Sequence, residues 1–387
     1  MSAAGQNPAV RPNTPAPRPL KIAMIGHKRV PGREGGVEVV VEELAGRLSA
    51  AGYAVTLYNR AARGMPRPKQ YAGARIVTVP TINKKSLDAV IYSFLATLHA
   101  IFLSGGYDVI HYHALGPSVM LALAHLLGRH TAATVHGLDW QRAKWGGFGS
   151  WYLKLGEKVI ARYADEVIVL SEGVREYFAQ TYGRSTTFLP NGVEPQPPAP
   201  PALIRQQWGL AGGDYLLFLA RIVPEKGLHY LLEAYKGLET DKKLVVAGGD
   251  SHSGDYWPMI QRLAAEDSRV ILAGFAAGQL KAELLQNAAL YVLPSDIEGM
   301  PISLLEAMRC GVPCLVSDIP ENTQLLGRFG ARFAKGDIEA LRTALQAALE
   351  NPPPAGPPQA EYIRQHYSWN ETARATAALY RRAAGLG

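Results

Sequence analysis

The chain has 387 residues, 48% of them hydrophobic, which is enough for two domains of ordinary size, each with its own core. The net charge of +7 is concentrated in the first half, because residues 18–193 carry 21 basic and 12 acidic side chains, whereas residues 194–387 carry 18 and 21. The basic half favours an anionic partner, either a phosphate-bearing substrate or a phospholipid surface, and not nucleic acid, for which no binding motif is present. Only two cysteines occur, Cys310 and Cys314, which excludes a disulfide framework and indicates inert thiols in a reducing compartment.

No segment has the pattern of a targeting signal or a membrane span. Residues 1–19 contain five prolines, lack the apolar core of a signal peptide and are predicted to be a disordered tail. The most apolar stretch, Leu87–Leu103, is interrupted by polar side chains and is short for a span. It is interpreted as a buried helix, with a membrane-contacting helix as the alternative. We expect a cytoplasmic protein, at most attached to the inner face of the cell membrane.

Short apolar runs alternate with longer helical patterns, which predicts parallel sheets built from βαβ units. In the first half, residues 37–50 place Val37, Val40, Val41, Leu44 and Leu48 at helical spacing. The strands predicted in this half are nearly all apolar, as strands covered on both faces should be: Lys21–Ile25, Ala54–Asn59, Ile76–Val79, Asp108–Tyr112, Ala132–Val135 and Val167–Leu170.

A proline-rich segment, residues 194–202, predicts a stiff linker. The alternation then starts again, with strands predicted at Tyr215–Ala220, Leu244–Ala247, Val270–Leu272, Leu290–Leu293 and Pro313–Val316. The fold class is therefore α/β, with two doubly wound domains, at 20–193 and 203–368, that face a cleft. A last helical segment, 369–387, is expected to pack back on the first domain. Ligands of such sheets bind at the carboxyl ends of the strands.

A glycine pair follows the first predicted strand and precedes a helix. Gly35 and Gly36 allow a ligand to approach the backbone closely, and the dipole of the following helix favours an anion. By itself this pair is a weak signal, since such glycines often only form a turn.

Histidines and aromatic residues mark the rest of the first half. His111 and His113 lie on one side of a strand, and core packing explains them better than a metal site, because no third ligand is evident. Residues 140–154 interleave aromatic side chains with Arg142, Lys144 and Lys154, which together with Lys84 and Lys85 suit a lipid-linked acceptor. A purely structural aromatic cluster is an equal alternative.

Two basic residues follow the first strand of the second domain. Arg221 and Lys226 lie on the loop at the carboxyl end of that strand, where they can reach into the cleft. An arginine binds phosphate oxygens as a fork, and a lysine acts as a compact charge. A solvated basic loop is the alternative.

The strongest signal is a pair of carboxylates at 298 and 306. Glu298 lies in the turn after a strand, and Glu306 lies two turns into a helix that is predicted to begin near Pro301. The turn Glu298–Gly299–Met300–Pro301 offers free backbone N–H groups beside a helix N-terminus. Each carboxylate can accept hydrogen bonds from a vicinal diol, one on a sugar and one on a ribose.

These motifs, together with the Leu-Pro-Asn-Gly-Val run at 189–193, resemble the retaining glycosyltransferases of family 4, which have the GT-B fold of two Rossmann-like domains. The resemblance covers about residues 20–385. The opening sequence IGHKRVPGREGGVEVVVEEL is similar to a bacterial subset for polysaccharide assembly, of which some members are rhamnosyltransferases.

The resemblance implies a role for each candidate residue. Glu306 holds the donor ribose, and Glu298 grips the donor sugar with the backbone of Gly299 and Met300. Arg221 and Lys226 neutralise the leaving diphosphate, against which Gly36 packs. His136 corresponds to a histidine beside the donor sugar, although a satisfied core histidine is the alternative.

The implied reaction moves a sugar from a nucleotide-diphosphate sugar to a glycan or lipid-linked acceptor. The leaving diphosphate is stabilised by Arg221 and Lys226, so no metal or other cofactor is expected. Two alternatives share the architecture: a nucleotide-sugar 2-epimerase, against which the aromatic and basic loop counts modestly, and a non-catalytic nucleotide-sugar-binding scaffold.

Overall fold

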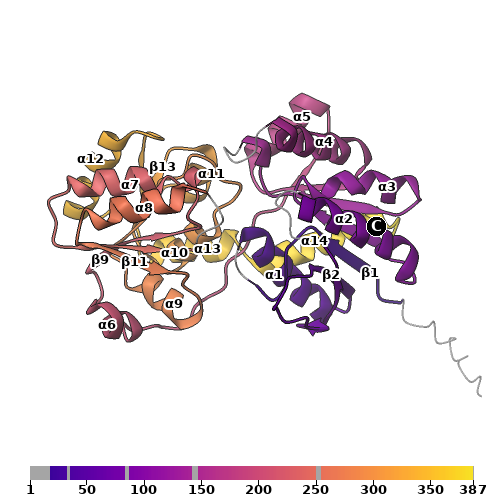
Figure 1. The fold of residues 1–387 in the computed structure, drawn as a ribbon, viewed down its shortest axis with the longest axis horizontal. Coiled ribbons are helices and arrows are strands. Elements are labelled where there is room, and N and C mark those ends of the chain that lie inside the picture. The colour runs from indigo at the N-terminus through magenta and orange to yellow at the C-terminus, as the bar shows by residue number, and fades with distance from the viewer. Residues whose placement is uncertain (1–17, 33–34, 83–86, 142–146, 250–253, 387) are drawn as a thin grey trace, which may run out of the picture.

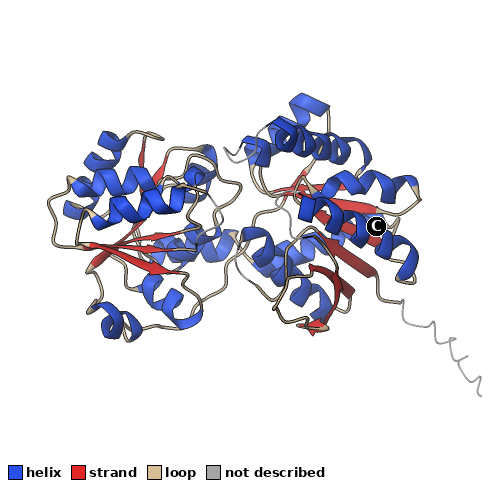
Figure 2. Ribbon diagram, viewed as in Figure 1, coloured by secondary structure: helices blue, strands red, loops and turns tan. Residues whose placement is uncertain are grey.

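A computed structural model describes residues 18–32, 35–82, 87–141, 147–249 and 254–386 as two α/β lobes side by side (Figures 1 and 2). Each lobe is a sheet with helices on both faces. This is the expected fold class, since each domain is built on a mostly or wholly parallel sheet. Most of the segment that was predicted to be a tail lies outside the described residues.

The first lobe contains an eight-stranded sheet. Its strands are β1 (Lys21–Ile25), β2 (Ala54–Arg60), β3 (Gln70–Tyr71), β4 (Ala74–Val79), β5 (Val109–His113), β6 (Thr131–Val135), β7 (Glu166–Val169) and β8 (Thr187–Phe188). Their order is β3-β4-β2-β1-β5-β6-β7-β8, and only the β3–β4 pair is antiparallel. The helical elements are α1 (Gly36–Ala50), α2 (Leu87–Leu98), η1 (His99–Leu103), η2 (Pro117–Met120), α3 (Leu121–Leu126), η3 (Asp139–Gln141), α4 (Gly147–Tyr163) and α5 (Glu172–Tyr182).

The second lobe contains a six-stranded parallel sheet. Its strands are β9 (Tyr215–Leu219), β10 (Lys243–Ala247), β11 (Val270–Gly274), β12 (Leu290–Leu293), β13 (Cys314–Ser317) and β14 (Ala331–Phe333), in the order β11-β10-β9-β12-β13-β14. The helical elements are α6 (Leu203–Trp208), η4 (Pro224–Lys226), α7 (Leu228–Lys236), α8 (Tyr256–Ala265), α9 (Gly278–Gln286), α10 (Ile302–Arg309), α11 (Pro320–Leu326), α12 (Ile338–Glu350) and α13 (Pro357–His366). The chain then returns to the first lobe as α14 (Trp369–Ala383).

The C-terminal helix α14 belongs to the core of the first lobe, where it lies beside α1 (Figure 1). Trp369 and Tyr380 are buried in the same apolar cluster as Ile22 and Met24 of β1. The chain therefore crosses between the lobes twice, and the two crossings touch. A Cβ on Gly192 would lie 2.1 Å from the backbone nitrogen of Trp369, so only glycine fits at this contact.

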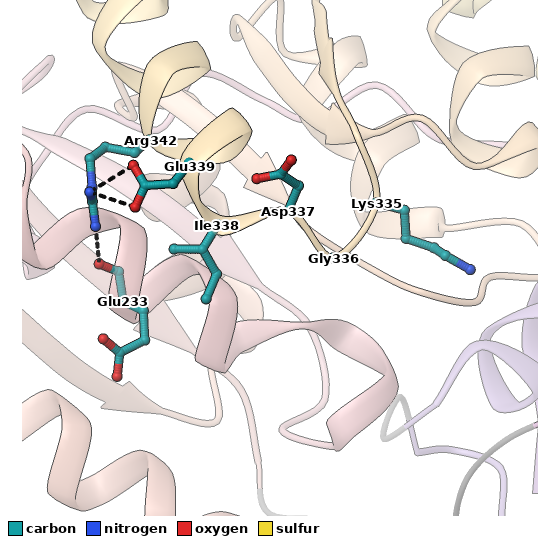
Figure 3. A pocket seen from close by; sticks show the side chains of 7 residues that line it. All are labelled: Glu233, Lys335, Gly336, Asp337, Ile338, Glu339 and Arg342. Carbon is teal, nitrogen blue, oxygen red and sulfur yellow. Dashed lines mark hydrogen bonds and ion pairs between the residues drawn. The ribbon is translucent and has the colours of Figure 1, made fainter.

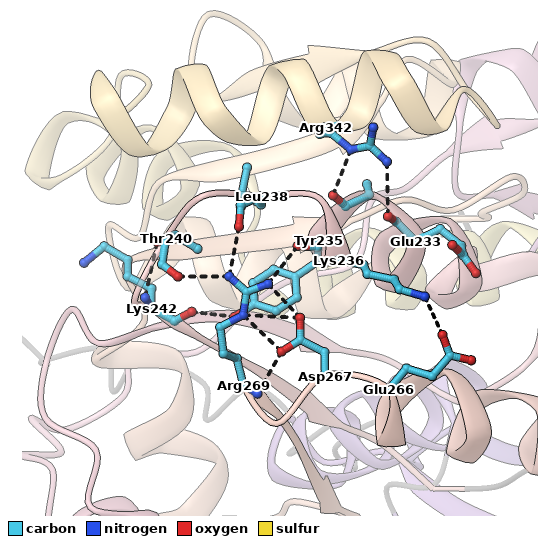
Figure 4. Close-up of polar contacts among 11 residues, drawn as sticks. Glu233, Tyr235, Lys236, Leu238, Thr240, Lys242, Glu266, Asp267, Arg269 and Arg342 are labelled. Atoms are coloured by element: carbon cyan, nitrogen blue, oxygen red, sulfur yellow. Dashed lines mark hydrogen bonds and ion pairs between the residues drawn. The ribbon is translucent and has the colours of Figure 1, made fainter.

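An arginine holds the C-terminal end of α7 to the start of β11 (Figure 4). Arg269 donates to the carbonyls of Leu238 and Thr240, each at 2.9 Å, and to both carboxylate oxygens of Asp267. Its guanidinium also lies over the ring of Tyr235, 4.7 Å from the centroid. A cation suits a helix C-terminus, whose last carbonyls lack helical partners. This network anchors the C-terminal end of α7, the helix that begins at Leu228, two residues after Lys226.

The apolar stretch at 87–103 forms α2 and η1 and is buried on one side only. Tyr92 and Ala96 face the core, whereas Phe94, Phe102 and Leu103 are exposed. Among the described residues, no helix has both the length and the apolar character needed to cross a membrane. The prediction of a buried helix is thus correct for one face of this segment.

Candidate active site

The strand order of each sheet reverses at one point, and the candidate residues lie there. In the second sheet the reversal falls between β9 and β12, which are neighbours. The loop after β9 carries Lys226 and the loop after β12 carries Glu298. In the first sheet the reversal falls between β1 and β5. Open parallel sheets bind their ligands outside the carboxyl ends of the strands at such points.

Lys226 and Glu298 form an ion pair across the reversal point of the second sheet. The Glu298 side chain is 5% exposed and the Lys226 side chain 14% exposed, so this pair is buried. Glu298 also accepts a hydrogen bond from the hydroxyl of Ser295 at 2.7 Å. The sequence predicts both residues but not their contact, which joins positions 72 apart.

The lysine loop is held against the end of β12 by a glycine. Gly227 has a φ of +67°, and a Cβ there would lie 2.0 Å from the carbonyl oxygen of Pro294. Any other residue would push the two loops apart, and with them Lys226 and Glu298. Arg221 is partly exposed in the same loop, before η4.

A second lysine–glutamate pair lies beside the first. Glu306, on the second turn of α10, is buried and accepts from the ammonium of Lys281 on α9 at 2.7 Å. The sequence prediction includes Glu306 and omits Lys281. A lysine near the start of a helix is usually a surface residue, so nothing in the sequence singles out Lys281.

The turn at 298–301 touches the first lobe directly. A Cβ on Gly299 would lie 1.7 Å from the carbonyl oxygen of His136, in the loop after β6. The side chain of Met300 is buried, and its sulfur lies 3.0 Å from the backbone nitrogen of Asn191 in the chain crossing. Pro301 is extended and precedes α10, which begins at Ile302, one residue later than the sequence suggests. The structure therefore brings Glu298, Gly299 and His136 together from both sheets.

The two glycines of the pair differ in the room around them. Gly35 is the extended residue before α1, and Gly36 begins the helix. A Cβ on Gly36 would meet no atom within 4 Å, whereas one on Gly35 would lie 2.6 Å from Glu38. Gly36 thus leaves open space at the N-terminus of α1, and such space is needed where a ligand approaches the backbone closely. Residues 33 and 34 lie outside the described residues.

His136 is partly buried and its ring nitrogen Nε2 lies 3.2 Å from Nδ1 of His113. His111 and His113 are fully buried in the first lobe. Among the residues that the structure describes, no three histidine, cysteine or acidic side chains are grouped to hold a metal ion. Cys310 is partly buried and Cys314 fully, and burial raises the pKa of the Cys310 thiol to about 11.

The aromatic segment divides into an anchored and an exposed part. Trp140 donates to the buried carboxylate of Glu157 at 2.7 Å, and the ammonium of Lys154 lies over its ring. Phe148 and Trp151 are instead 70% and 58% exposed. The structural alternative thus holds at Trp140, while the aromatic side chains on α4 are exposed, and a lipid-linked acceptor stays a prediction. Arg142 and Lys144 lie outside the described residues, as do Lys84 and Lys85.

A hollow of about 760 Å³ lies away from these residues, at the start of α12 (Figure 3). Arg342 in its wall binds both carboxylate oxygens of Glu339 and the backbone carbonyl of Glu233. Asp337 caps α12 through the backbone N–H of Ala340. We assign no substrate contact to this hollow.

Comparison with known protein families gives two matches that together span most of the chain. Residues 34–197 match the model of glycosyltransferase family 4, and residues 202–369 match that of glycosyl transferases group 1.

Curated relatives and solved structures extend this finding. The chain is 28% identical over 353 residues to a GDP-mannose-dependent α-(1-6)-phosphatidylinositol monomannoside mannosyltransferase of Mycolicibacterium smegmatis, covering 83% of this chain and 87% of that one. It is 26% identical to the D-inositol 3-phosphate glycosyltransferase of Gordonia bronchialis, over 96% and 90% of the two chains. Its fold superposes on sucrose-phosphate synthase from Thermosynechococcus elongatus with a TM-score of 0.80, at 22% identity over 95% and 100% of the chains. The Anabaena protein HepE in complex with UDP and glucose gives a TM-score of 0.75 at 19% identity, over 93% and 98% of the chains.

Proposed function

This chain belongs to the family 4 glycosyltransferases, and we propose that it transfers a hexosyl or deoxyhexosyl group to a glycan or lipid-linked acceptor during assembly of a bacterial surface polysaccharide. The donor is a nucleotide-diphosphate sugar, and family members typically use one without a metal cofactor. We further propose that the configuration of the sugar is retained, as in the family. Rhamnose is a candidate sugar on the resemblance of residues 25–44 alone. Both matched families consist of transferases, so neither a 2-epimerase nor a non-catalytic scaffold gains support.

The observation that carries the proposal is the pair of buried carboxylates, each bound to a lysine, at the strand-order reversal of the second sheet. A buried carboxylate is retained only where something compensates its desolvation. The lysines do so here, and both carboxylates face the loops where such sheets bind ligands. We assign the donor sugar to Glu298 and the ribose to Glu306.

In the proposed mechanism, Lys226 and Arg221 stabilise the negative charge that grows on the leaving diphosphate. Such preorganised charge is commonly the largest contribution to catalysis of this type. The ammonium of Lys226 is shared between Glu298 and the diphosphate, which links the sugar contact to the phosphate contact. The backbone N–H groups of Gly299 and Met300 orient the sugar. The turn at Gly35–Gly36 approaches the diphosphate from the first lobe, where the N-terminus of α1 favours an anion.

The acceptor is proposed to reach the site from an anionic membrane. Exposed apolar side chains on α2, η1 and α4 of the basic first lobe support this: Phe94, Phe102, Leu103, Phe148 and Trp151. Both α2 and α4 pack against η2, and η1 directly continues α2. Two relatives are named as acting on phosphatidylinositol lipids. Apolar side chains insert at the headgroup boundary, while basic residues are attracted to anionic headgroups.

Vesicle sedimentation tests the membrane proposal. We expect the protein to bind vesicles that contain phosphatidylglycerol, and this binding should weaken steeply with added salt. A Phe102→Ser, Leu103→Ser double variant has the same charge and should bind these vesicles more weakly. Leu126→Ser is the matched control, an equally exposed leucine at the end of α3. Equal binding to neutral and anionic vesicles would contradict the proposal.

A screen of nucleotide sugars tests the transfer itself. Uridine, guanosine, adenosine and thymidine diphosphate sugars are compared by thermal shift, because a ligand that binds the folded state raises the melting temperature. We expect one base to be preferred, and the preferred donor to release its nucleoside diphosphate when a lipid-linked glycan is added. Donor isomerisation without acceptor would instead show an epimerase.

A further inference from the structure

Three histidines line one face of the first sheet, next to the proposed position of the donor sugar. Strands β5 and β6 pair in parallel with His113 opposite Thr134. Because side chains alternate along a strand, His111 and His113 share a face, and Thr134 shares it with His136 two residues on. The histidines therefore form a row that runs from the core to the loop against Gly299.

The hydrogen bonds of this row are unequal. His111 is satisfied on both sides, by the hydroxyl of Tyr380 at 2.6 Å and that of Thr134 at 2.8 Å. His113 bonds through Nδ1 to Nε2 of His136, and its own Nε2 is buried with no hydrogen-bond partner among the described residues. The ring centroids of His111 and His113 lie 4.1 Å apart.

Both buried histidines are neutral near pH 7. Burial lowers the pKa of His111 to about 3 and that of His113 well below its usual value. The neighbouring histidines His111, His136 and His27 lower the pKa of His113 further, and among the described residues no carboxylate is a cause that raises it. Each ring therefore carries one N–H group and one lone pair.

Neutrality leaves two arrangements for the His113–His136 bond. If His113 carried its proton on Nε2, a buried N–H would have no acceptor. If it carries the proton on Nδ1, only the lone pair of Nε2 lacks a partner. Buried donors without an acceptor are rarer in proteins than buried acceptors without a donor, so the second arrangement is favoured. The second arrangement makes Nδ1–H of His113 the donor and Nε2 of His136 the acceptor.

We propose that His113 is a positioning residue for sugar transfer, which holds Nε2 of His136 as an acceptor and so makes His136 present its Nδ1–H to the donor sugar. The tautomer of a histidine is set by the bond that its other nitrogen makes. His136 then acts as a fixed hydrogen-bond donor to a sugar hydroxyl, and its inward nitrogen is not available as a base. This inference rests on the proposed function, which places the donor sugar beside His136.

Three variants test the role in transfer. His113→Leu removes the bond and keeps an apolar side chain, and we expect kcat to fall about 10- to 100-fold with little change in the donor KM, as for other residues that orient a reactive group. His113→Asn places an amide N–H near the position of Nδ1 and should recover most of the rate. Tyr380→Phe is the matched control, because it removes a buried hydrogen bond of the same row without touching His136. It should lower the melting temperature and leave kcat unchanged.

Nitrogen NMR of the imidazole rings tests the tautomer without any activity assay. The protein is labelled with 15N-histidine, and the His136 signals are assigned with His136→Gln. We expect the proton of His136 on Nδ1 in the wild type and in His113→Asn. In His113→Leu we expect a mixture of the two neutral tautomers of His136. A proton on Nε2 in the wild type would overturn the inference, as would an unchanged kcat in His113→Leu. Equal losses of rate in Tyr380→Phe would reduce His113 to a structural residue. If the wild type turns over no nucleotide sugar, the proposed function itself fails, and the role in transfer fails with it.

Discussion

Removing Lys226 should destabilise the protein as well as inactivate it, because its partner is buried. With side-chain exposures of 14% and 5%, Lys226 and Glu298 are a buried pair rather than a surface one. Surface pairs contribute about 0–1 kcal/mol, whereas removing one partner of a buried pair costs about 3–5 kcal/mol. Because Ser295 still donates to Glu298, we expect Lys226→Met to lie at the lower end, about 3 kcal/mol. For a domain of this size that lowers the melting temperature by about 6–12 °C.

A double-mutant cycle separates this loss from the loss of catalysis. Lys226→Met with Glu298→Gln leaves no uncompensated charge, so the double variant should melt above Lys226→Met while remaining inactive. Melting is followed by circular dichroism and transfer by release of nucleoside diphosphate. The buried-pair reasoning would be refuted if Lys226→Met had the melting temperature of the wild type, or if the double variant melted at a lower temperature than Lys226→Met.

Four further outcomes follow from the structure. Gly299→Ala places a methyl group 1.7 Å from a carbonyl of the other lobe and should lower both the melting temperature and the rate, whereas Gly36→Ala meets no atom within 4 Å and should weaken donor binding at an unchanged melting temperature. Arg269→Ala removes a helix anchor distant from the site, and should cost about 2–3 kcal/mol in urea unfolding with kcat unaltered; a change in kcat at full stability would contradict this. His27 and His111 have pKa values lowered by burial to about 4 and about 3, so the unfolded chain takes up protons first as the pH falls below about 6.5. Stability is full above that pH and each histidine should remove about 2 kcal/mol by pH 5, which an equal urea midpoint at pH 7 and pH 5 would disprove. Transfer should persist in excess EDTA, and an activity that manganese or magnesium restored would show a metal requirement.

The strands of both sheets are readable from the sequence because burial on two faces makes them nearly all apolar. β1 and β12 begin and end as predicted, and most others shift by one or two residues. The strands that escape prediction, β3, β8 and β14, have only two or three residues each, too few for any pattern. All three lie at sheet edges, where pairing with the neighbouring strand, rather than the intrinsic propensity of the residues, decides whether a strand forms.

The candidate site is predictable as separate residues and not as an arrangement. Lys226 and Glu298 each follow a strand, which the sequence shows, but their pairing depends on β9 and β12 being neighbours. Lys281 carries no signal until α9 is placed beside α10. The bond between His113 and His136 likewise requires the register of β5 and β6, and the sequence by itself favours core packing for His113.

A crystal structure with the preferred nucleoside diphosphate bound tests the central claim most directly. The account predicts the diphosphate within hydrogen-bonding distance of the Lys226 ammonium and near the Gly35–Gly36 turn, with the ribose hydroxyls on Glu306. A nucleotide bound elsewhere, for instance in the hollow beside Arg342, with Lys226 and Glu306 still paired only to their protein partners, would contradict it.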